Sequence, residues 1–142
     1  MFLFKRKKIS YIQEMCEQLK IFMLQYIKDY PMSSNIVIPI FSNAEKMLKS
    51  NSERDIIKLL KSNNINIECA ILNIIQNFAM AELKPKSGVD FLKSSNDDYA
   101  LELYNYTNVL KLEKGYISKQ QFEENKMLGV KMSLQSPLGN WF

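Results

Sequence analysis

Large apolar residues recur every three or four positions through most of the chain, which is the spacing that places side chains on one face of an α-helix. The clearest case runs from about Ser10 to Tyr30. Ser10 and Gln13 have the spacing of a capping box, and Pro31 disfavours helical geometry in the residue before it. The apolar stripe of this predicted helix consists of Ile12, Met15, Cys16, Leu19, Phe22, Met23, Tyr26, Ile27 and Tyr30.

The next segment has two interpretations. Residues Ile36–Phe41 are rich in β-branched side chains, which favours a strand. The apolar positions from Ile36 to Leu48 also keep helical spacing, and Pro39 is tolerated if it lies in a first helical turn. We favour a helix that is kinked or begins near Pro39 and ends by Ser50, with Ser42 and Glu45 as a second candidate cap.

Four further helices are expected after this segment. A short helix containing Ile56 and Leu60 lies between a turn at Asn51–Ser52 and the pair Asn63–Asn64. A helix over about residues 67–83 is apolar on more than one face, which is typical of a central helix. After a break at residues 84–88, a helix runs from about Ser95 to Lys114 and stops at Gly115, with Tyr99, Leu103, Tyr106 and Leu110 as its apolar stripe. Ser118 then caps a last helix that ends near Gly129.

These elements predict an all-α fold, a single compact bundle of five to seven helices. We expect three parts: a flexible basic N-terminal arm at residues 1–9, a helical domain at 10–128, and an irregular apolar C-terminal tail at 129–142. Residues 84–88 mark a candidate sub-boundary inside the domain.

The net charge is confined to the N-terminal arm. The chain has 19 basic and 15 acidic residues and a formal charge of +4, and Lys5, Arg6, Lys7 and Lys8 account for the whole excess. Phe2 and Phe4 precede this tetrad, so the arm resembles an anchor for an anionic membrane surface. It also suits phosphate contacts with nucleic acid, although the neutral body lacks a basic face. A frayed terminus that aids solubility is the third interpretation.

The residues for common catalytic chemistry are missing. The chain has no histidine and two cysteines, and it contains neither nucleotide-binding glycine motif, so we expect no enzyme, no metal and no cofactor. The acidic pairs Asp97–Asp98 and Glu123–Glu124 are interpreted as helix capping and as a solvated face; acid-only catalysis stays an alternative. Cys16 and Cys69 are expected as buried reduced thiols. The absence of an export signal or a long apolar run predicts a cytoplasmic protein.

Two groups of aromatic residues are candidate partner contacts. The tail carries Leu138, Trp141 and Phe142, which either anchor a protein partner or a second copy, or fold back on the helices and bury Trp141. Tyr99, Tyr104 and Tyr106 lie among asparagines, which is typical of an adaptable interface and also of a helix edge where the core meets water.

Residues 115–128 read GYISKQQFEENKML. This segment is similar to the core of the short C-terminal domain (SHOCT) family, in which one helix ends at glycine and an Ile-Ser/Thr pair starts a second. Leu112 also fits that pattern, whereas Asn108 and Lys111 stand where leucines are usual, and the chain continues beyond Leu128. The resemblance, over about residues 103–128, implies a two-helix appendage that mediates contacts, without catalytic residues. The matching positions are Gly115, Ile117, Ser118, Gln121, Phe122, Glu123, Lys126 and Leu128.

Together these patterns predict a small cytoplasmic binding protein that acts by occupying a protein partner, as an inhibitor, an immunity-type or phage-type antagonist, or an adaptor. The abundance of Ile, Asn and Lys is typical of an AT-rich bacterial or phage genome. The alternative is binding of nucleic acid or an anionic membrane surface through residues 2–8. A homodimer is also left open.

Overall fold

The computed structural model describes residues 10–82 and 95–131. Over these residues the chain forms six α-helices and one 3₁₀ turn and has no strand, which confirms the predicted all-α bundle. The helices are α1 (Tyr11–Asp29), α2 (Ser34–Lys49), α3 (Glu53–Asn63), α4 (Ile67–Glu82), α5 (Ser95–Glu113) and α6 (Lys119–Lys131), and the 3₁₀ turn is η1 (Pro31–Ser33). The basic arm, the segment 84–88 and most of the tail lie outside the described residues.

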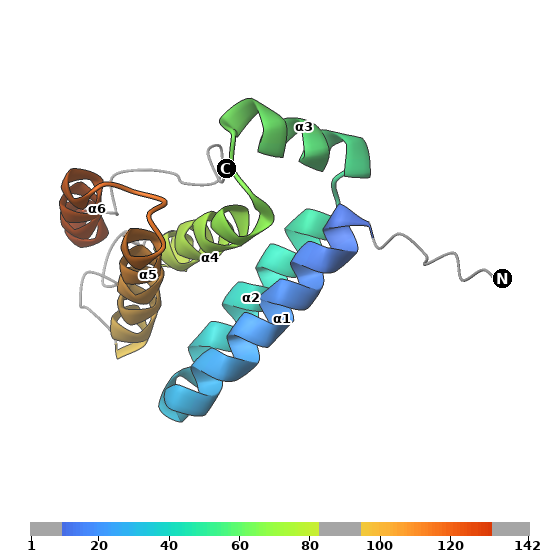
Figure 1. Ribbon diagram of the computed structural model, residues 1–142. Coiled ribbons are helices and arrows are strands. Elements are labelled where there is room, and N and C mark those ends of the chain that lie inside the picture. Colours follow the sequence, from blue (N-terminus) through green and yellow to red (C-terminus); the bar gives the residue numbers. More distant parts are fainter. Residues whose placement is uncertain (1–9, 83–94, 132–142) are drawn as a thin grey trace, which may run out of the picture.

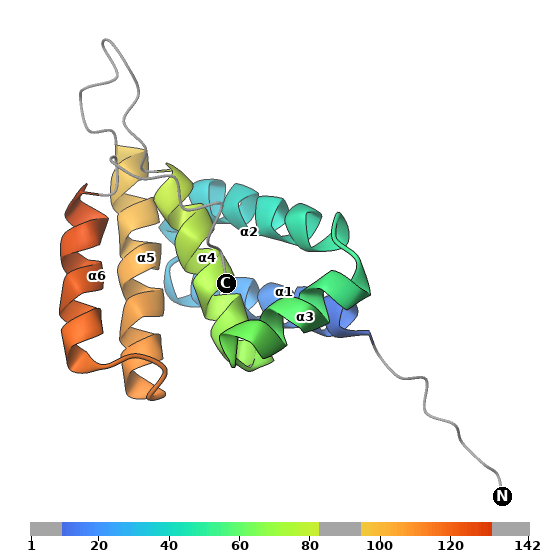
Figure 2. The ribbon, with the colours of Figure 1, turned by 90° about the horizontal axis from the view of Figure 1, so that it is seen from above.

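The helices form two antiparallel pairs that cross at a steep angle. α1 and α2 make one pair, α4 and α5 make the other, and α3 bridges the start of α1 to the start of α4 (Figures 1 and 2). α6 lies on the outer side of α5 and packs principally on that helix. The order of layers is therefore α1/α2, then α4/α5, then α6.

The centre of the core is α4, as its two apolar faces predict. Its side chains are buried at positions that go round the helix, because α1, α2 and α5 all pack against it. Its buried residues are Cys69, Ala70, Ile71, Leu72, Ile74, Ile75, Gln76, Ala79 and Met80.

Residues Ile36–Phe41 are helical, as favoured over the strand, and of the two alternatives for Pro39 the one in which the helix begins near this residue is wrong. α2 starts at Ser34, directly after the turn η1, so Pro39 lies inside the helix and Ser42 is no cap. Proline removes one helical hydrogen bond, to the carbonyl of Asn35. Both Asn35 and Pro39 are exposed, so solvent can reach that carbonyl and the cost is small.

The first helix begins as predicted, with an addition from another element. The side chain of Ser10 accepts a hydrogen bond from the backbone N–H of Gln13 at 3.0 Å. The Oε1 of Gln13 accepts the backbone N–H of Ser10 at 3.3 Å, which completes the capping box. The carboxylate of Glu53, at the start of α3, accepts the backbone N–H groups of Tyr11 and Ile12. A negative charge at this position also complements the helix dipole.

A compact turn joins α5 to α6. Gly115 has φ of +75°, and the N–H groups of Gly115 and Tyr116 bond back to the carbonyls of Leu112 and Lys111 at 3.1 and 2.9 Å, which is a Schellman motif. Ser118 caps α6, as expected, by accepting the N–H of Gln121 at 3.1 Å. α6 ends at Lys131, two residues beyond Gly129, near which its end was expected.

Candidate protein-binding groove

The buried face of α5 combines apolar with polar side chains, and its predicted stripe is corrected accordingly. The structure buries Leu103 as expected, but Tyr106 and Leu110 are half-buried on a neighbouring side of the helix. The buried polar side chains of α5 form hydrogen bonds with other side chains or with backbone carbonyls. The buried residues of α5 are Ala100, Leu103, Tyr104, Thr107, Asn108 and Lys111.

One of these buried groups is a lysine in the α4–α5 interface. Lys111 is 7% exposed, and its Nζ donates a 2.9 Å hydrogen bond to Oε1 of Gln76 on α4. Burial lowers the pKa of Lys111, because it removes water from the ammonium. The Nε2 of Gln76 is buried and has no hydrogen-bond partner in the described structure. The pair therefore holds α4 to α5 while one amide donor goes unused.

Two other buried side chains hold α6 to α5. The hydroxyl of Tyr104 donates to the backbone carbonyl of Asn125 at 2.8 Å, and Nδ2 of Asn108 donates to the carbonyl of Phe122 at 3.0 Å. Asn125 in turn donates to Oδ1 of Asn108 at 3.0 Å. The prediction of Tyr104 as a partner contact is therefore wrong: it is 1% exposed, and burial raises its pKa to about 12.

Tyr106 belongs to an aromatic cluster that joins α5 to α1. Its ring lies edge-on to Phe22 and Tyr26 with centroid distances of 5.8 and 5.1 Å, and edge-on to Tyr30 at 6.1 Å. Each such edge-to-face pair contributes about 0.5–1.5 kcal/mol beyond its buried area. The cluster fixes Tyr106, half-buried, at the floor of an open groove.

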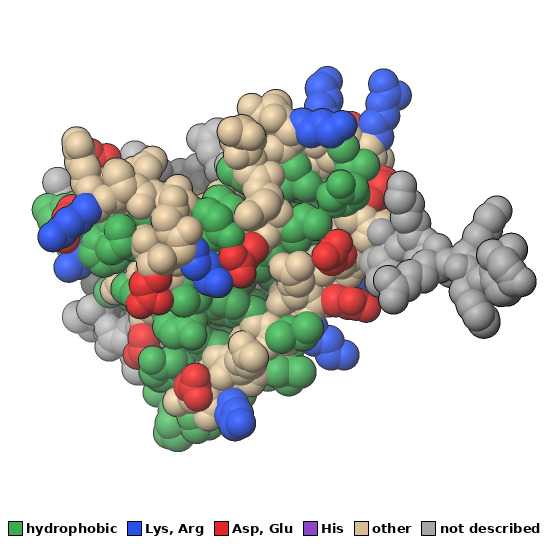
Figure 3. Space-filling view, viewed as in Figure 1, with side chains coloured by type: hydrophobic (Ala, Val, Ile, Leu, Met, Phe, Trp, Pro, Cys, Tyr) green, Lys and Arg blue, Asp and Glu red, His purple; other side chains and the backbone are tan. Residues whose placement is uncertain are grey.

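The groove itself lies between α1, α4 and α5 and has a volume of about 300 Å³. Hydrophobic side chains gather on this face of the molecule between α1 and α5 (Figure 3). The α1 side carries Ile21 at 57% exposure, and Leu24, at 55%, follows on the exposed surface of the same helix. The lining residues are Gln18, Ile21, Phe22, Gln25, Glu68, Ile71, Leu72, Tyr106, Leu110 and Lys114.

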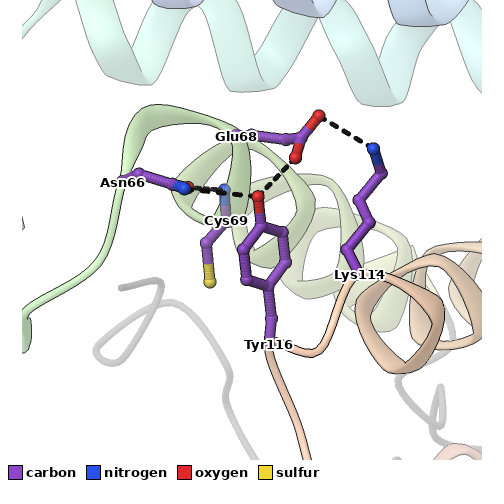
Figure 4. A network of polar contacts seen from close by, with 5 residues as sticks. All are labelled: Asn66, Glu68, Cys69, Lys114 and Tyr116. Atoms are coloured by element: carbon purple, nitrogen blue, oxygen red, sulfur yellow. Dashed lines mark hydrogen bonds and ion pairs between the residues drawn. The ribbon is translucent and has the colours of Figure 1, made fainter.

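A polar network borders the groove, because Glu68 and Lys114 belong to both; Figure 4 shows the side chains of this network. Glu68 lies between Lys114, whose Nζ is 3.0 Å from Oε2, and Tyr116, whose hydroxyl donates to Oε1. These hydrogen bonds, Tyr116's foremost, lower the pKa of the Glu68 carboxyl. Asn66 caps α4 by accepting the N–H of Cys69 at 2.8 Å, and it also donates to the Tyr116 hydroxyl at 3.3 Å. The network fixes the α5–α6 turn against the start of α4.

Two other hollows are less suited to a ligand. A wide, shallow depression of about 870 Å³ lies beside the α3–α4 connection and has a mixed lining of Tyr11, Leu60, Lys61 and residues 64–68. A smaller one of about 280 Å³ lies between α1 and α2. Among the side chains that the structure describes, which exclude those of Asp97 and Asp98, no three Cys, Asp or Glu gather as a metal site would require. No helix of the described part of the chain is long and apolar enough to cross a membrane.

The remaining candidate residues are distributed as follows. Tyr99 is half-buried, and Glu123 and Glu124 are exposed on α6, as the solvated-face interpretation predicts. Cys16 is half-buried and Cys69 buried, and both thiols are free. The side chains of Asp97 and Asp98 lie outside the described structure, as do Lys5, Arg6, Lys7, Lys8, Leu138, Trp141 and Phe142.

Sequence reasoning found Tyr106 and missed the α1 side of the groove. Ile21 and Leu24 fall off the main stripe of their helix, and two large apolar side chains three positions apart on a second face were the available signal. The Glu68–Lys114 pair joins residues 46 positions apart and leaves no local pattern.

Comparisons with known proteins add no relative. No family model matches the chain, and neither a curated protein nor a solved structure is similar enough to indicate a relationship.

Proposed function

We propose that this protein is a small, non-enzymatic binding protein whose α1–α4–α5 groove receives an amphipathic helix of a protein partner. The observation that carries this proposal is the half-enclosed apolar groove flanked by the exposed side chains of Ile21 and Leu24. Helix-in-groove recognition uses this combination, in which a few apolar anchors enter a hydrophobic channel. Clustered exposed apolar side chains on a soluble domain also mark interaction sites more often than isolated ones do.

The chemistry of the groove favours a side chain over a small metabolite. Its volume of about 300 Å³ lies at the lower end of the roughly 300–1,000 Å³ of small-molecule sites. Its charged groups, Glu68 and Lys114, already pair with each other at the rim. A partner helix could fill this volume with one large apolar residue and cover Ile21 and Leu24 with further apolar residues.

The biological role we propose is occupation of the partner, as an inhibitor, an antagonist of the immunity or phage type, or an adaptor, in the cytoplasm. The resemblance of the α5–α6 hairpin to the SHOCT pattern supports a contact role, because that family's hairpin is an appendage for contacts. This chain differs from the SHOCT pattern at Asn108 and Lys111, which are buried here and stand where leucines are usual in that family.

A second candidate function rests on the arm. Lys5, Arg6, Lys7 and Lys8 directly precede α1 and hold the entire excess of positive charge. Each such cation contributes about 1 kcal/mol at an anionic membrane surface. On nucleic acid, the same cations would neutralise phosphates and release their counterions. Both modes weaken steeply as salt rises.

Capture of partners from the native host at low and high salt tests the two functions. Ile21→Asp places a charge in the groove, and Met32→Asp is the matched control, since Met32 is 80% exposed at the α1–α2 turn. Groove binding predicts a protein captured at both salt concentrations, lost at least tenfold with Ile21→Asp and retained with Met32→Asp. Equal capture by the two variants contradicts the groove. Binding that disappears at high salt, and on replacing the four arm cations with alanine, supports the arm.

A further inference from the structure

Carboxylates surround the α1–α4–α5 groove. Exposed charged residues either line it or lie three or four positions from a lining residue on the same helix, which places them on the same helix face. The basic ones are Lys28 and Lys114, and Lys114 is already paired with Glu68. The acidic ones outnumber them and form an acidic rim, which consists of Glu14, Glu17, Asp29, Glu68, Glu102 and Glu113. Figure 3 shows acidic side chains around the hydrophobic centre of this face.

The aromatic floor of the groove lies within the electrostatic reach of this rim from both sides. Burial raises the pKa of the Tyr106 hydroxyl, and the negative charges of Asp29 on α1 and Glu113 on α5 raise it further. The pKa of Tyr26 is raised by burial and then by the charge of Glu102. The ring of Tyr26 lies edge-on to that of Tyr106 at 5.1 Å. Carboxylates of two helices therefore act on one and the same floor.

Basic side chains gather on a different face. Arg54, Lys58 and Lys61 are exposed and follow one another at spacings of four and three along α3, so they form one stripe. Figure 3 shows basic side chains along the upper edge of the molecule, where α3 lies. After residue 8 the chain has equal numbers of acidic and basic residues, so the acidic rim is a local feature and does not follow from the net charge. This separation of charge attracts a cationic partner to the groove and repels it from α3.

We propose that the occupant of the groove is a cationic amphipathic helix of another protein, an inference that rests on the proposed function and specifies its partner. Apolar residues of that helix enter the groove and cover Ile21 and Leu24, and lysines or arginines beside them face the acidic rim. Glu102 and Glu113 are about 17 Å apart along α5, so a helix of about three to four turns can bring a cation to each. Pairs at an exposed rim act mainly on the association rate and on the choice of partner, whereas the apolar contacts persist when salt is raised.

The test uses two labelled synthetic helices of about five turns with the same leucine stripe, one with lysines beside it and one with glutamates. Their binding to the full chain is measured by fluorescence anisotropy. At low salt we expect the lysine helix to bind at least about fivefold more tightly. At about 1 M salt, where the Debye length falls to about 3 Å, we expect both helices to bind with affinities within about twofold of each other.

Matched variants locate the effect, and circular dichroism checks that each is folded. Glu102→Lys combined with Glu113→Lys is expected to abolish the preference for the lysine helix. Glu123→Lys combined with Glu124→Lys changes the net charge equally on the exposed face of α6 and is expected to retain the preference. Ile21→Ser is expected to weaken both helices several-fold, and the control Met32→Ser to leave them unchanged.

Four results would overturn the inference. They are equal binding of the two helices at low salt, binding of neither, a preference that survives the double change at Glu102 and Glu113, and binding of the lysine helix that Ile21→Ser does not weaken. Self-association in sedimentation velocity that Ile21→Ser abolishes would assign the groove to a second copy instead.

Capture from the native host separates this inference from the proposed function. Capture that is lost with Ile21→Asp but unaffected by the double change at Glu102 and Glu113 keeps the groove function and removes the cationic partner. Groove-dependent binding of the lysine helix without any captured host protein keeps the preference of the groove for cationic helices and contradicts the proposed function.

Discussion

The buried pair of Lys111 and Gln76 gives the sharpest test of how the bundle is held together. Lys111 has no acidic partner among the described residues, and its one hydrogen bond is the 2.9 Å contact with Gln76. Gln76→Leu fills the same space, yet it leaves a buried ammonium without an acceptor. Lys111→Met removes the charge instead, and the double variant replaces the whole pair with apolar side chains.

The magnitudes follow from burial. A hydrogen bond to a charged group contributes about 1.5–3 kcal/mol, so Gln76→Leu is expected to reduce the free energy of unfolding by about 2–3 kcal/mol at neutral pH. Lys111→Met leaves the Gln76 amide unpaired, at a cost of about 1 kcal/mol after the gain in apolar burial. Replacing both is expected to be neutral or stabilising by about 1–3 kcal/mol, as for other buried polar pairs exchanged for well-packed apolar ones.

The assay is urea unfolding followed by circular dichroism, analysed as a double-mutant cycle at several pH values. The pKa of Lys111 lies below its unfolded value of 10.5, so between the two values the unfolded chain binds more protons and stability rises with pH. Without Gln76 the folded pKa falls further. The deficit caused by Gln76→Leu is therefore expected to shrink between pH 7 and about pH 9, where ordinary tyrosines are still largely protonated.

Three outcomes would refute this reasoning. They are a cost below about 0.5 kcal/mol for Gln76→Leu at pH 7, a coupling energy near zero, and a deficit that does not change with pH. The first two would mean that the ammonium reaches water in solution. The third would mean that Lys111 stays protonated in the folded variant.

Three further substitutions test local contacts by chemical unfolding. Glu53→Gln removes the charge that accepts the first N–H groups of α1, and we expect it to lower the free energy of unfolding by about 1 kcal/mol. The control Glu45→Gln, in an exposed helical ion pair, is expected to lower it by at most about 0.5 kcal/mol. Equal losses would contradict the capping role of Glu53. Tyr104→Phe removes the bond to the Asn125 carbonyl and is expected to cost about 1 kcal/mol and to speed amide exchange in α6; unchanged exchange would contradict it. Gly115→Ala meets no atom within 4 Å but keeps φ near +75°, so a loss of about 1 kcal/mol is expected from backbone strain alone, and an unchanged stability would contradict that.

The helices could be predicted because their signals are local. Ser10, Gly115 and Ser118 act at the helix ends where the sequence places them, and the spacing of apolar residues marks each helix. Pro39 left two alternatives open, and the one in which α2 begins near this residue is wrong, because η1 starts the helix earlier and the exposed surface tolerates one missing hydrogen bond.

The rotation of α5 could not be predicted by the same means. Pattern analysis treats lysine and asparagine as facing solvent, but Lys111 and Asn108 are buried with partners on α4 and α6. Those partners lie 35 and 14 positions away along the chain, so neither contact leaves a helical spacing. The groove was missed for a related reason, because it forms only where three helices meet. Ile21 lines it together with residues of α4 and α5, which the sequence around Ile21 does not indicate.

The most direct test of the central claim is photo-crosslinking in cells of the native host, with a crosslinking amino acid at position 21 or at position 32. Position 21 borders the groove, whereas position 32 is the more exposed of the two and lies away from it. We expect a discrete adduct with another protein from position 21 and none from position 32. Absence of an adduct at position 21, or the same adducts from both positions, would contradict a binding function for the groove.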